Sequence, residues 1–196
     1  MKVTGIYGGS FNPIHDGHVR LAKALAGSGL VDEMWLLVSP QNPFKVNASL
    51  LDDETRLRLA RLAVSHVPGV GVCDREFSLP RPSYMYHTLC ALREEHPLRE
   101  FVLVIGADNW ERFPDWYRSR DILSDFRIII FPRPGFVLRD VPEGITIADT
   151  PLLDISSTEI RHRIATDPDY DGEGLPGVVW KEIQAKGLYR PGGEGA

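Results

Sequence analysis

Residues 2–18 read KVTGIYGGSFNPIHDGH, and this stretch decides the fold. Residues 2–7 form a short strand-like run that two glycines follow directly. Residues 15–27 then carry apolar side chains at spacings of three and four, which predicts a helix with one apolar face. A strand, a glycine turn and a helix in this order predict a βα unit whose turn lets backbone N–H groups approach a ligand.

The same alternation continues through the rest of the chain. Strands are predicted at residues 33–38, 70–73, 100–105, 126–131 and 144–148, and further helices at residues 52–66, 83–95, 109–113, 156–165 and 176–186. Strands that alternate with helices favour a mostly parallel sheet with helices on both faces and right-handed crossovers. We therefore expect one Rossmann-like, doubly wound α/β domain over residues 1–190, followed by a disordered tail at residues 191–196.

The composition and net charge limit the kinds of partner that we expect the protein to bind. The chain has 196 residues, 43% of them hydrophobic and 25% charged, and a net charge of −5, which is ordinary for a soluble globular protein. This charge argues against nucleic acid or a membrane surface as a partner. No segment reaches the length of a membrane span and the N-terminus lacks the features of a signal peptide, so we expect a cytoplasmic protein. Whether it forms a homo-oligomer stays open.

The two cysteines, Cys73 and Cys90, lie in apolar segments without the spacing of metal ligands. We expect both to be buried, reduced thiols.

Two histidines follow the glycine turn. His15 and His18 are three residues apart, so they share a face at the first turn of the predicted helix. Imidazole N–H groups beside a helix N-terminus favour a polyphosphate, and Gly17 leaves the approach open. A chance surface pair and a metal site are the alternatives, although no carboxylate or cysteine stands at a useful local spacing.

The whole string from Gly9 to His18 resembles the pattern G-x-F-x-P-x-H-x-G-H of the nucleotidylyltransferases. Residues 155–161, ISSTEIR, resemble that family's I-S-S-T-x-I-R segment. Hydroxyl and N–H groups at a helix start can hold phosphate, and Arg161 can add a positive charge one turn later. A capping box between Ser156 and Glu159 is an alternative interpretation that is compatible with the first.

Further segments resemble the bacterial nicotinate-nucleotide adenylyltransferases within this superfamily. They are residues 105–108 (IGAD) with residues 116–117 (WY), Arg133 after a predicted strand, and residues 82–89 (PSYMYHTL). A strand-end aspartate can bind ribose hydroxyls and a tryptophan can stack on a pyridine ring. The chain departs from the family at Met85, where a threonine is usual, and at Phe44, where relatives often have histidine before the retained Lys45.

The resemblance implies transfer of AMP from ATP to nicotinate mononucleotide, giving nicotinic acid adenine dinucleotide and pyrophosphate in NAD biosynthesis. The acceptor phosphate would attack the α-phosphorus in line, so the protein's task is positioning and charge neutralisation. The implied catalytic residues are His15, His18 and Arg161, and Mg²⁺ would be held through ATP. The implied ATP contacts are Gly8, Gly9, Ser10, Phe11, His15, Gly17, His18, Lys45, Gly106, Asp108, Arg133, Ser156, Ser157, Thr158 and Arg161. The implied mononucleotide contacts are Ser10, Lys45, Tyr84, Met85, Asp108 and Trp116.

Two other functions are compatible with parts of this pattern. An adenylyltransferase for nicotinamide mononucleotide or phosphopantetheine would share the glycine and histidine segment, although residues 105–108 and 116–117 favour a pyridine nucleotide. A non-catalytic nucleotide-binding domain would share the fold, but it would not need to keep His15, His18 and Arg161 together.

Overall fold

The structure is a computed structural model that describes residues 1–40, 50–139, 141–151, 154–193 and 195. In these residues the strands form one parallel sheet in the order β3-β2-β1-β4-β5-β6. The strands are β1 (Lys2–Gly9), β2 (Glu33–Val38), β3 (Val70–Cys73), β4 (Arg99–Gly106), β5 (Arg127–Phe131) and β6 (Thr146–Ile147). All strands are parallel, but successive strands are added on one side of β1 as far as β3 and on its other side from β4 onward. In doubly wound sheets, ligands bind at this switch point, beyond the carboxyl ends of the strands.

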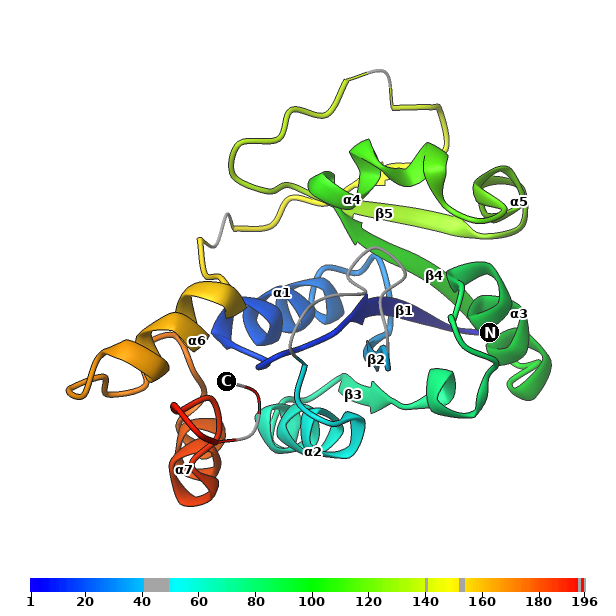
Figure 1. Ribbon diagram of the computed structural model, residues 1–196. Helices are drawn as coiled ribbons and strands as arrows, with labels where there is room; N and C mark the ends of the chain where they lie inside the picture. The colour runs from blue at the N-terminus through cyan, green and yellow to red at the C-terminus, as the bar shows by residue number, and fades with distance from the viewer. Residues whose placement is uncertain (41–49, 140, 152–153, 194, 196) are drawn as a thin grey trace.

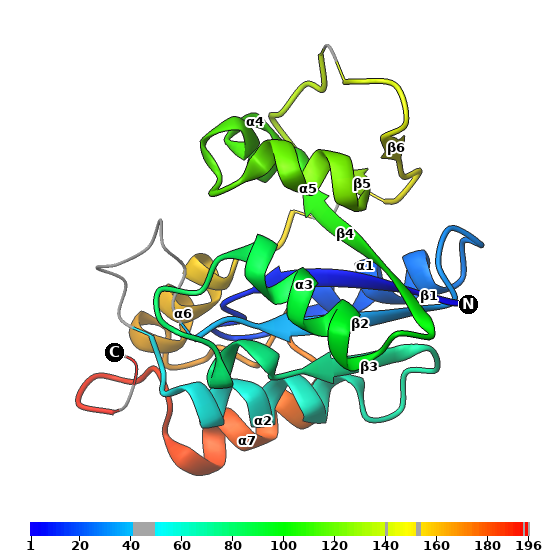
Figure 2. The same cartoon turned by 90° about the vertical axis from the view of Figure 1, so that its right-hand side faces the viewer.

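Helices cover both faces of the sheet (Figures 1 and 2). The α-helices are α1 (Asp16–Ala26), α2 (Asp53–Val64), α3 (Met85–Glu95), α4 (Ala107–Glu111), α5 (Ser119–Asp125), α6 (Ser157–Thr166) and α7 (Gly177–Lys186). Two 3-10 helices are η1 (Arg75–Ser78) and η2 (Phe113–Asp115).

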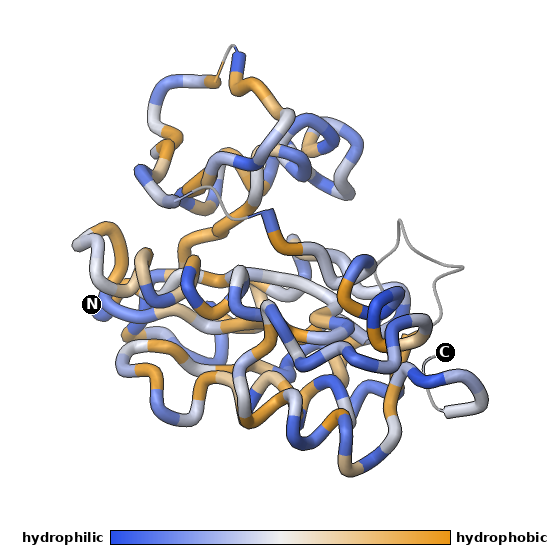
Figure 3. The backbone as a smooth tube through the Cα atoms, turned by 90° about the vertical axis from the view of Figure 1, so that its left-hand side faces the viewer, coloured by the Kyte–Doolittle hydropathy of each residue, from blue (hydrophilic) through white to orange (hydrophobic). Residues whose placement is uncertain are grey.

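Two hydrophobic cores result, one on each face. Side chains of α1, α2, α6 and α7 pack on one face, and those of α3, η2 and α5 pack on the other. The strand residues alternate between the cores: Tyr7 belongs to the first and Ile6 to the second, as strand geometry requires. In Figure 3, apolar stretches in orange alternate with hydrophilic stretches in blue along the chain.

The predicted fold class is therefore confirmed, and the bounds of β2 and β3 agree with the prediction to the residue. Helix α5 and the two 3-10 helices were not predicted. Helix α5 has seven residues and buries only Ile122, so it carries too few apolar positions to show a helical period. The last strand, β6, is two residues long instead of the five predicted.

Both cysteines are free thiols, as expected. Cys73 is buried, but the prediction that Cys90 is buried was wrong: it is half-buried because its position on α3 lies beside the core stripe of Leu89 and Leu92. No helix in the described part of the chain is long and apolar enough to cross a membrane.

A buried arginine joins the ends of β1 and β2 to helix α2. Arg56 has no exposed surface. Its guanidinium donates to the backbone carbonyls of Ser10 (2.6 Å), Ser39 (2.8 Å), Leu51 (3.0 Å) and Pro40 (3.3 Å), and it pairs with the Asp53 carboxylate at 2.5 Å. Since a buried carbonyl without a donor is costly, one side chain satisfies a large part of the backbone around this corner.

Replacing Arg56 with alanine should strongly destabilise the fold. The Arg56→Ala variant leaves four backbone carbonyls without this donor, while Asp53 loses this partner and keeps its ion pair with Arg81, so we expect the free energy of unfolding to fall by about 3–5 kcal/mol. Urea denaturation followed by circular dichroism measures this. Arg58→Ala is the matched control on the same helix, because Arg58 is 46% exposed and its ion pair with Glu182 should contribute at most about 1 kcal/mol. Equal losses in the two variants would contradict the assignment.

Candidate active site

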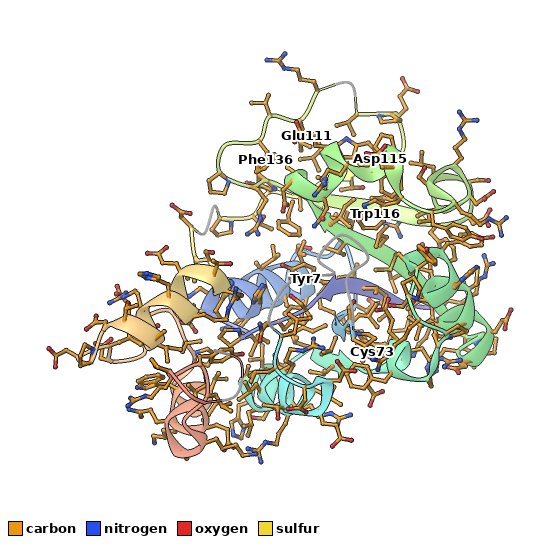
Figure 4. The ribbon with its side chains drawn as sticks, viewed as in Figure 1. Tyr7, Cys73, Glu111, Asp115, Trp116 and Phe136 are labelled. Carbon is orange, nitrogen blue, oxygen red and sulfur yellow. The ribbon has the colours of Figure 1, made fainter. Side chains whose placement is uncertain are left out.

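Two adjoining cavities open at the carboxyl ends of β1 and β4, where the sheet reverses. The first, which we call the polar chamber, has a volume of about 840 Å³. The second, the aromatic chamber, has a volume of about 450 Å³. The two share a wall made of Tyr7, Gly8, Gly9, Asn109 and Trp116. Figure 4 shows Trp116 above Tyr7, with the two side chains reaching the cavities from different segments of the chain.

The polar chamber gathers most of the residues predicted to bind ATP. Of these it is lined by Gly8, Gly9, Ser10, Phe11, His15, His18, Asp108, Arg133, Ser156, Ser157, Thr158 and Arg161. Gly17 and Gly106 lie beside it without lining it, and Tyr84 and Met85 line the aromatic chamber instead. Lys45 and Phe44 lie outside the described residues.

The turn from Gly9 to Pro13, which we call the glycine turn, is held in place by hydrogen bonds to its backbone carbonyls. The carbonyl of Gly9 accepts from the Ser39 amide (2.9 Å), and that of Ser10 accepts from Arg56. The carbonyl of Asn12 accepts from Arg161 (2.7 Å), and that of Pro13 accepts from the Ser157 hydroxyl (2.9 Å). Carbonyl oxygens carry partial negative charge and repel phosphate. Here protein donors form hydrogen bonds with these oxygens, so the oxygens are satisfied within the protein.

His15 and His18 lie together at the start of α1. Their rings stack at 3.6 Å between centroids with 22° between planes, and His18 Nδ1 accepts from the His15 backbone N–H at 3.2 Å. A side chain on Gly17 would come within 2.9 Å of the His15 ring, so glycine is needed between the histidines. The two histidines, which were predicted to share one face of the helix, thus stack directly on each other.

Burial sets the charge of His15. Its side chain is 3% exposed, and its Nδ1 has no hydrogen-bond partner among the described residues. Burial, helped by the positive charge of Arg133, lowers the pKa of His15 from 6.5 to about 4. The imidazole is therefore neutral at pH 7, with one ring nitrogen able to donate and the other able to accept.

Arg133 and Asp108 face each other across the mouth of the polar chamber. The Arg133 Nε atom lies 3.5 Å from Asp108 Oδ1, an ion pair whose members are each about one-third exposed. A side chain at Gly106 would collide with the Asp108 carboxylate and approach Arg133 Cγ to 3.1 Å. The glycine predicted from the strand end thus lets these two charged side chains meet.

The segment 156–161 starts helix α6 without the predicted capping box. The Ser156 side chain makes no capping bond to the helix, so that alternative is wrong. The neighbouring Ser157 hydroxyl donates to Pro13, and Arg161 donates to Asn12 and approaches the Thr158 hydroxyl at 3.4 Å. Binding to the glycine turn takes the place of capping here, because the turn packs directly against the helix start.

The aromatic chamber is built from two segments. Tyr84 at the start of α3 lies 4.7 Å from Tyr117, centroid to centroid, and Trp116 lies beside them in the wall. Met85 fills the space over Gly8, where a side chain would come within 2.9 Å of the Met85 methyl group. Met85, where the chain departs from the family pattern, is therefore a packed residue in the wall of the aromatic chamber.

Several residues around the chambers escaped the sequence interpretation. Glu76 is buried in the wall of the aromatic chamber, where its carboxylate accepts from Ser83 and Thr88, both at 2.9 Å. Arg56 could have been found, because it falls on the apolar face of α2 with Ala60 and Ala63, four and seven residues later. No comparable pattern marks Asn12, whose partners are far away in sequence.

Metal ions in proteins are held by particular arrangements of ligand side chains. Within residues 1–40, 50–139, 141–151, 154–193 and 195, no group of three His, Cys, Asp or Glu side chains is arranged to hold a metal ion.

The low pKa of His15 predicts a pH dependence of stability. Between pH 6.5 and about 4 the unfolded chain binds a proton at His15 that the folded chain does not, so the free energy of unfolding should fall as the pH falls through this window. The slope from this residue is at most about 1.4 kcal/mol per pH unit. Urea denaturation at several pH values should give a shallower dependence for His15→Asn. The exposed His66→Asn variant controls for loss of a histidine, and equal slopes in all three proteins would refute the assignment.

Comparison with known proteins finds matches over most of the chain. A family model described as cytidylyltransferase-like matches residues 6–163. A probable nicotinate-nucleotide adenylyltransferase of Bacteroides fragilis is 49% identical over 183 residues, which is 92% of this chain and 91% of the relative. One of Cytophaga hutchinsonii is 40% identical over 193 residues, 97% of each chain.

Solved structures show the same fold. The Plasmodium falciparum nicotinic acid mononucleotide adenylyltransferase complexed with NaAD superposes with a TM-score of 0.81, covering 96% of this chain and 98% of that one at 20% identity. The chain belongs to the nicotinate-nucleotide adenylyltransferases of the cytidylyltransferase-like family.

Proposed function

We propose that this protein transfers AMP from ATP to nicotinate mononucleotide, releasing pyrophosphate and forming nicotinic acid adenine dinucleotide, a step of NAD biosynthesis. One observation carries the proposal: a polar chamber with histidines and arginines adjoins an aromatic chamber, and Gly8 and Gly9 form part of the wall between them. A triphosphate in the first and a pyridine ring in the second would bring the acceptor phosphate to the α-phosphorus at the shared wall. Residues 1–190 would act as one catalytic unit.

The histidines are proposed to stabilise the charge that moves during transfer. His18 would donate to the α-phosphate oxygens and His15 to the polyphosphate. A neutral imidazole can donate one hydrogen bond, and the anion would favour its protonation because negative charge raises a histidine pKa. Donors fixed before the reaction stabilise the transition state without reorganisation.

The remaining polar groups would hold the two ends of ATP. Arg161, the residues 156–158 and Lys45 are proposed to bind the leaving pyrophosphate, with Arg133 and Asp108 on the adenosine side. Mg²⁺ would be bound mainly by ATP oxygens and water, where it would neutralise part of the phosphate charge. Pairing of Arg161 with the Asn12 carbonyl would let the same side chain support the turn and face the ligand.

The aromatic chamber supports a pyridine nucleotide as the acceptor. Trp116, Tyr84 and Tyr117 offer flat surfaces for stacking on a ring. Met85 would act through its backbone N–H and its packing, because its side chain lies against Gly8. The preference for the acid over the amide is tested by competition between the two mononucleotides in one reaction, where the acid should be consumed first.

His18 is expected to be essential for turnover. The His18→Ala variant should release pyrophosphate at least about a hundredfold more slowly, the usual loss for one transition-state donor. A coupled pyrophosphate assay with ATP, Mg²⁺ and nicotinate mononucleotide measures this. His162→Ala is the matched control, because His162 is exposed on α6 and lines neither chamber. Near-normal turnover of His18→Ala would remove His18 from the mechanism, and an inactive wild type would refute the proposed reaction.

Trp116 is expected to bind the pyridine ring. The Trp116→Ala variant should raise the KM for nicotinate mononucleotide by about tenfold or more, since a lost ring stack is worth about 1–3 kcal/mol. The control is Trp110→Ala, which removes a tryptophan that stacks on Phe113 and lines neither chamber. A KM that stays at the wild-type value in Trp116→Ala would place the ring elsewhere.

A further inference from the structure

A residue with a strained backbone lies beside His18. Phe11 has a backbone φ of 45°, in the left-handed region that a phenylalanine rarely adopts. Its ring is 2% exposed and meets the His18 ring edge-on, with centroids 4.9 Å apart at 83°. It also contacts Tyr7 at 5.7 Å. The unusual backbone conformation thus places an aromatic wall against His18, and the surrounding structure must hold it there.

The next residue, Asn12, provides the hold. Its side chain is buried, and its Oδ1 atom accepts from the Tyr189 hydroxyl at 2.8 Å and from the Leu51 amide at 3.3 Å. Its backbone carbonyl accepts from Arg161. Asn12 is therefore fixed at both its side chain and its backbone, which restrains the conformation of the residue before it.

Tyr189 comes from the other end of the chain, 177 residues away. Tyr189 follows α7 and is 1% exposed. Its φ of 63° lies in the left-handed region, and this backbone conformation directs the buried side chain toward Asn12. Burial raises the pKa of the Tyr189 hydroxyl, which keeps its proton for donation to Asn12. Tyr189 lines neither chamber.

We propose that Tyr189 is a positioning residue for His18, acting through Asn12 and Phe11. Its hydroxyl holds the Asn12 side chain, Asn12 holds Phe11 in the left-handed conformation, and the Phe11 ring fixes the orientation of the His18 imidazole. The chain end is thus part of the support of the catalytic site. This inference rests on the proposed function of His18.

The test compares two variants that each lose one hydrogen-bonded tyrosine hydroxyl. Tyr189→Phe keeps the ring and removes only the bond to Asn12, so we expect kcat to fall by about five- to tenfold, which is the scale of one hydrogen bond. The KM for nicotinate mononucleotide should stay within about twofold, because neither Tyr189 nor Asn12 borders the aromatic chamber. Tyr170→Phe is the matched control: its hydroxyl donates to the Glu173 carbonyl at 2.5 Å, and neither residue lines a chamber. It should leave kcat unchanged while losing similar stability in urea.

A double-variant experiment separates positioning from general weakening. If Tyr189 acts through His18, Tyr189→Phe should lower kcat no further when His18→Ala is already present. The expected result is a loss in the wild-type background alone. An equal loss in both backgrounds, the same loss in Tyr170→Phe, or no loss in Tyr189→Phe would each overturn the inference. A wild type that releases no pyrophosphate would instead refute the proposed function, so the two failures are distinguishable.

Discussion

The turn from Gly9 to Pro13 depends on donors for its backbone carbonyls, and the surrounding architecture supplies them. Each buried carbonyl left without a donor would cost about 1–3 kcal/mol. The donors come from the end of β2, from Arg56 of α2, and from Ser157 and Arg161 of α6. This requirement ties the switch point of the sheet to two helices that are remote in sequence.

The same requirement explains why several polar residues are buried around the site. Arg56 and Asn12 are fully or almost fully buried, yet each has partners that satisfy its hydrogen bonds. Their bonds fix the turn, and the turn places Phe11 beside His18. Gly8 and Gly9, where the turn begins, line both chambers. Precise placement matters for a phosphoryl-type transfer because positioning and charge stabilisation supply most of its catalysis.

The polar chamber combines positively charged arginines with a neutral histidine. The protein carries a net charge of −5, so attraction of a polyphosphate must come from local groups. Arg133 and Arg161 supply positive charge, while His15 is neutral because burial and Arg133 lower its pKa to about 4. Two adjacent charged imidazoles in a buried stack would repel each other, so a neutral His15 allows the 3.6 Å stack to form.

The sequence by itself determined the alternation of strands and helices and the positions of His15 and His18, because these follow from local periodicity and spacing. The two glycines predicted to follow the first strand are instead its last residues, because β1 pairs with β2 as far as Gly9. The sequence also indicated most of the polar residues that line one chamber, since they stand at the carboxyl ends of strands or at helix starts. Tertiary structure alone decided that Arg56 and Tyr189 support the turn, and that Ser157 binds Pro13 while Ser156 caps nothing. The physical reason is that most of these bonds end on backbone carbonyls, and Tyr189 reaches Asn12 across 177 residues. Every residue has a backbone carbonyl, so the sequence contains no pattern that shows which distant side chain donates to it.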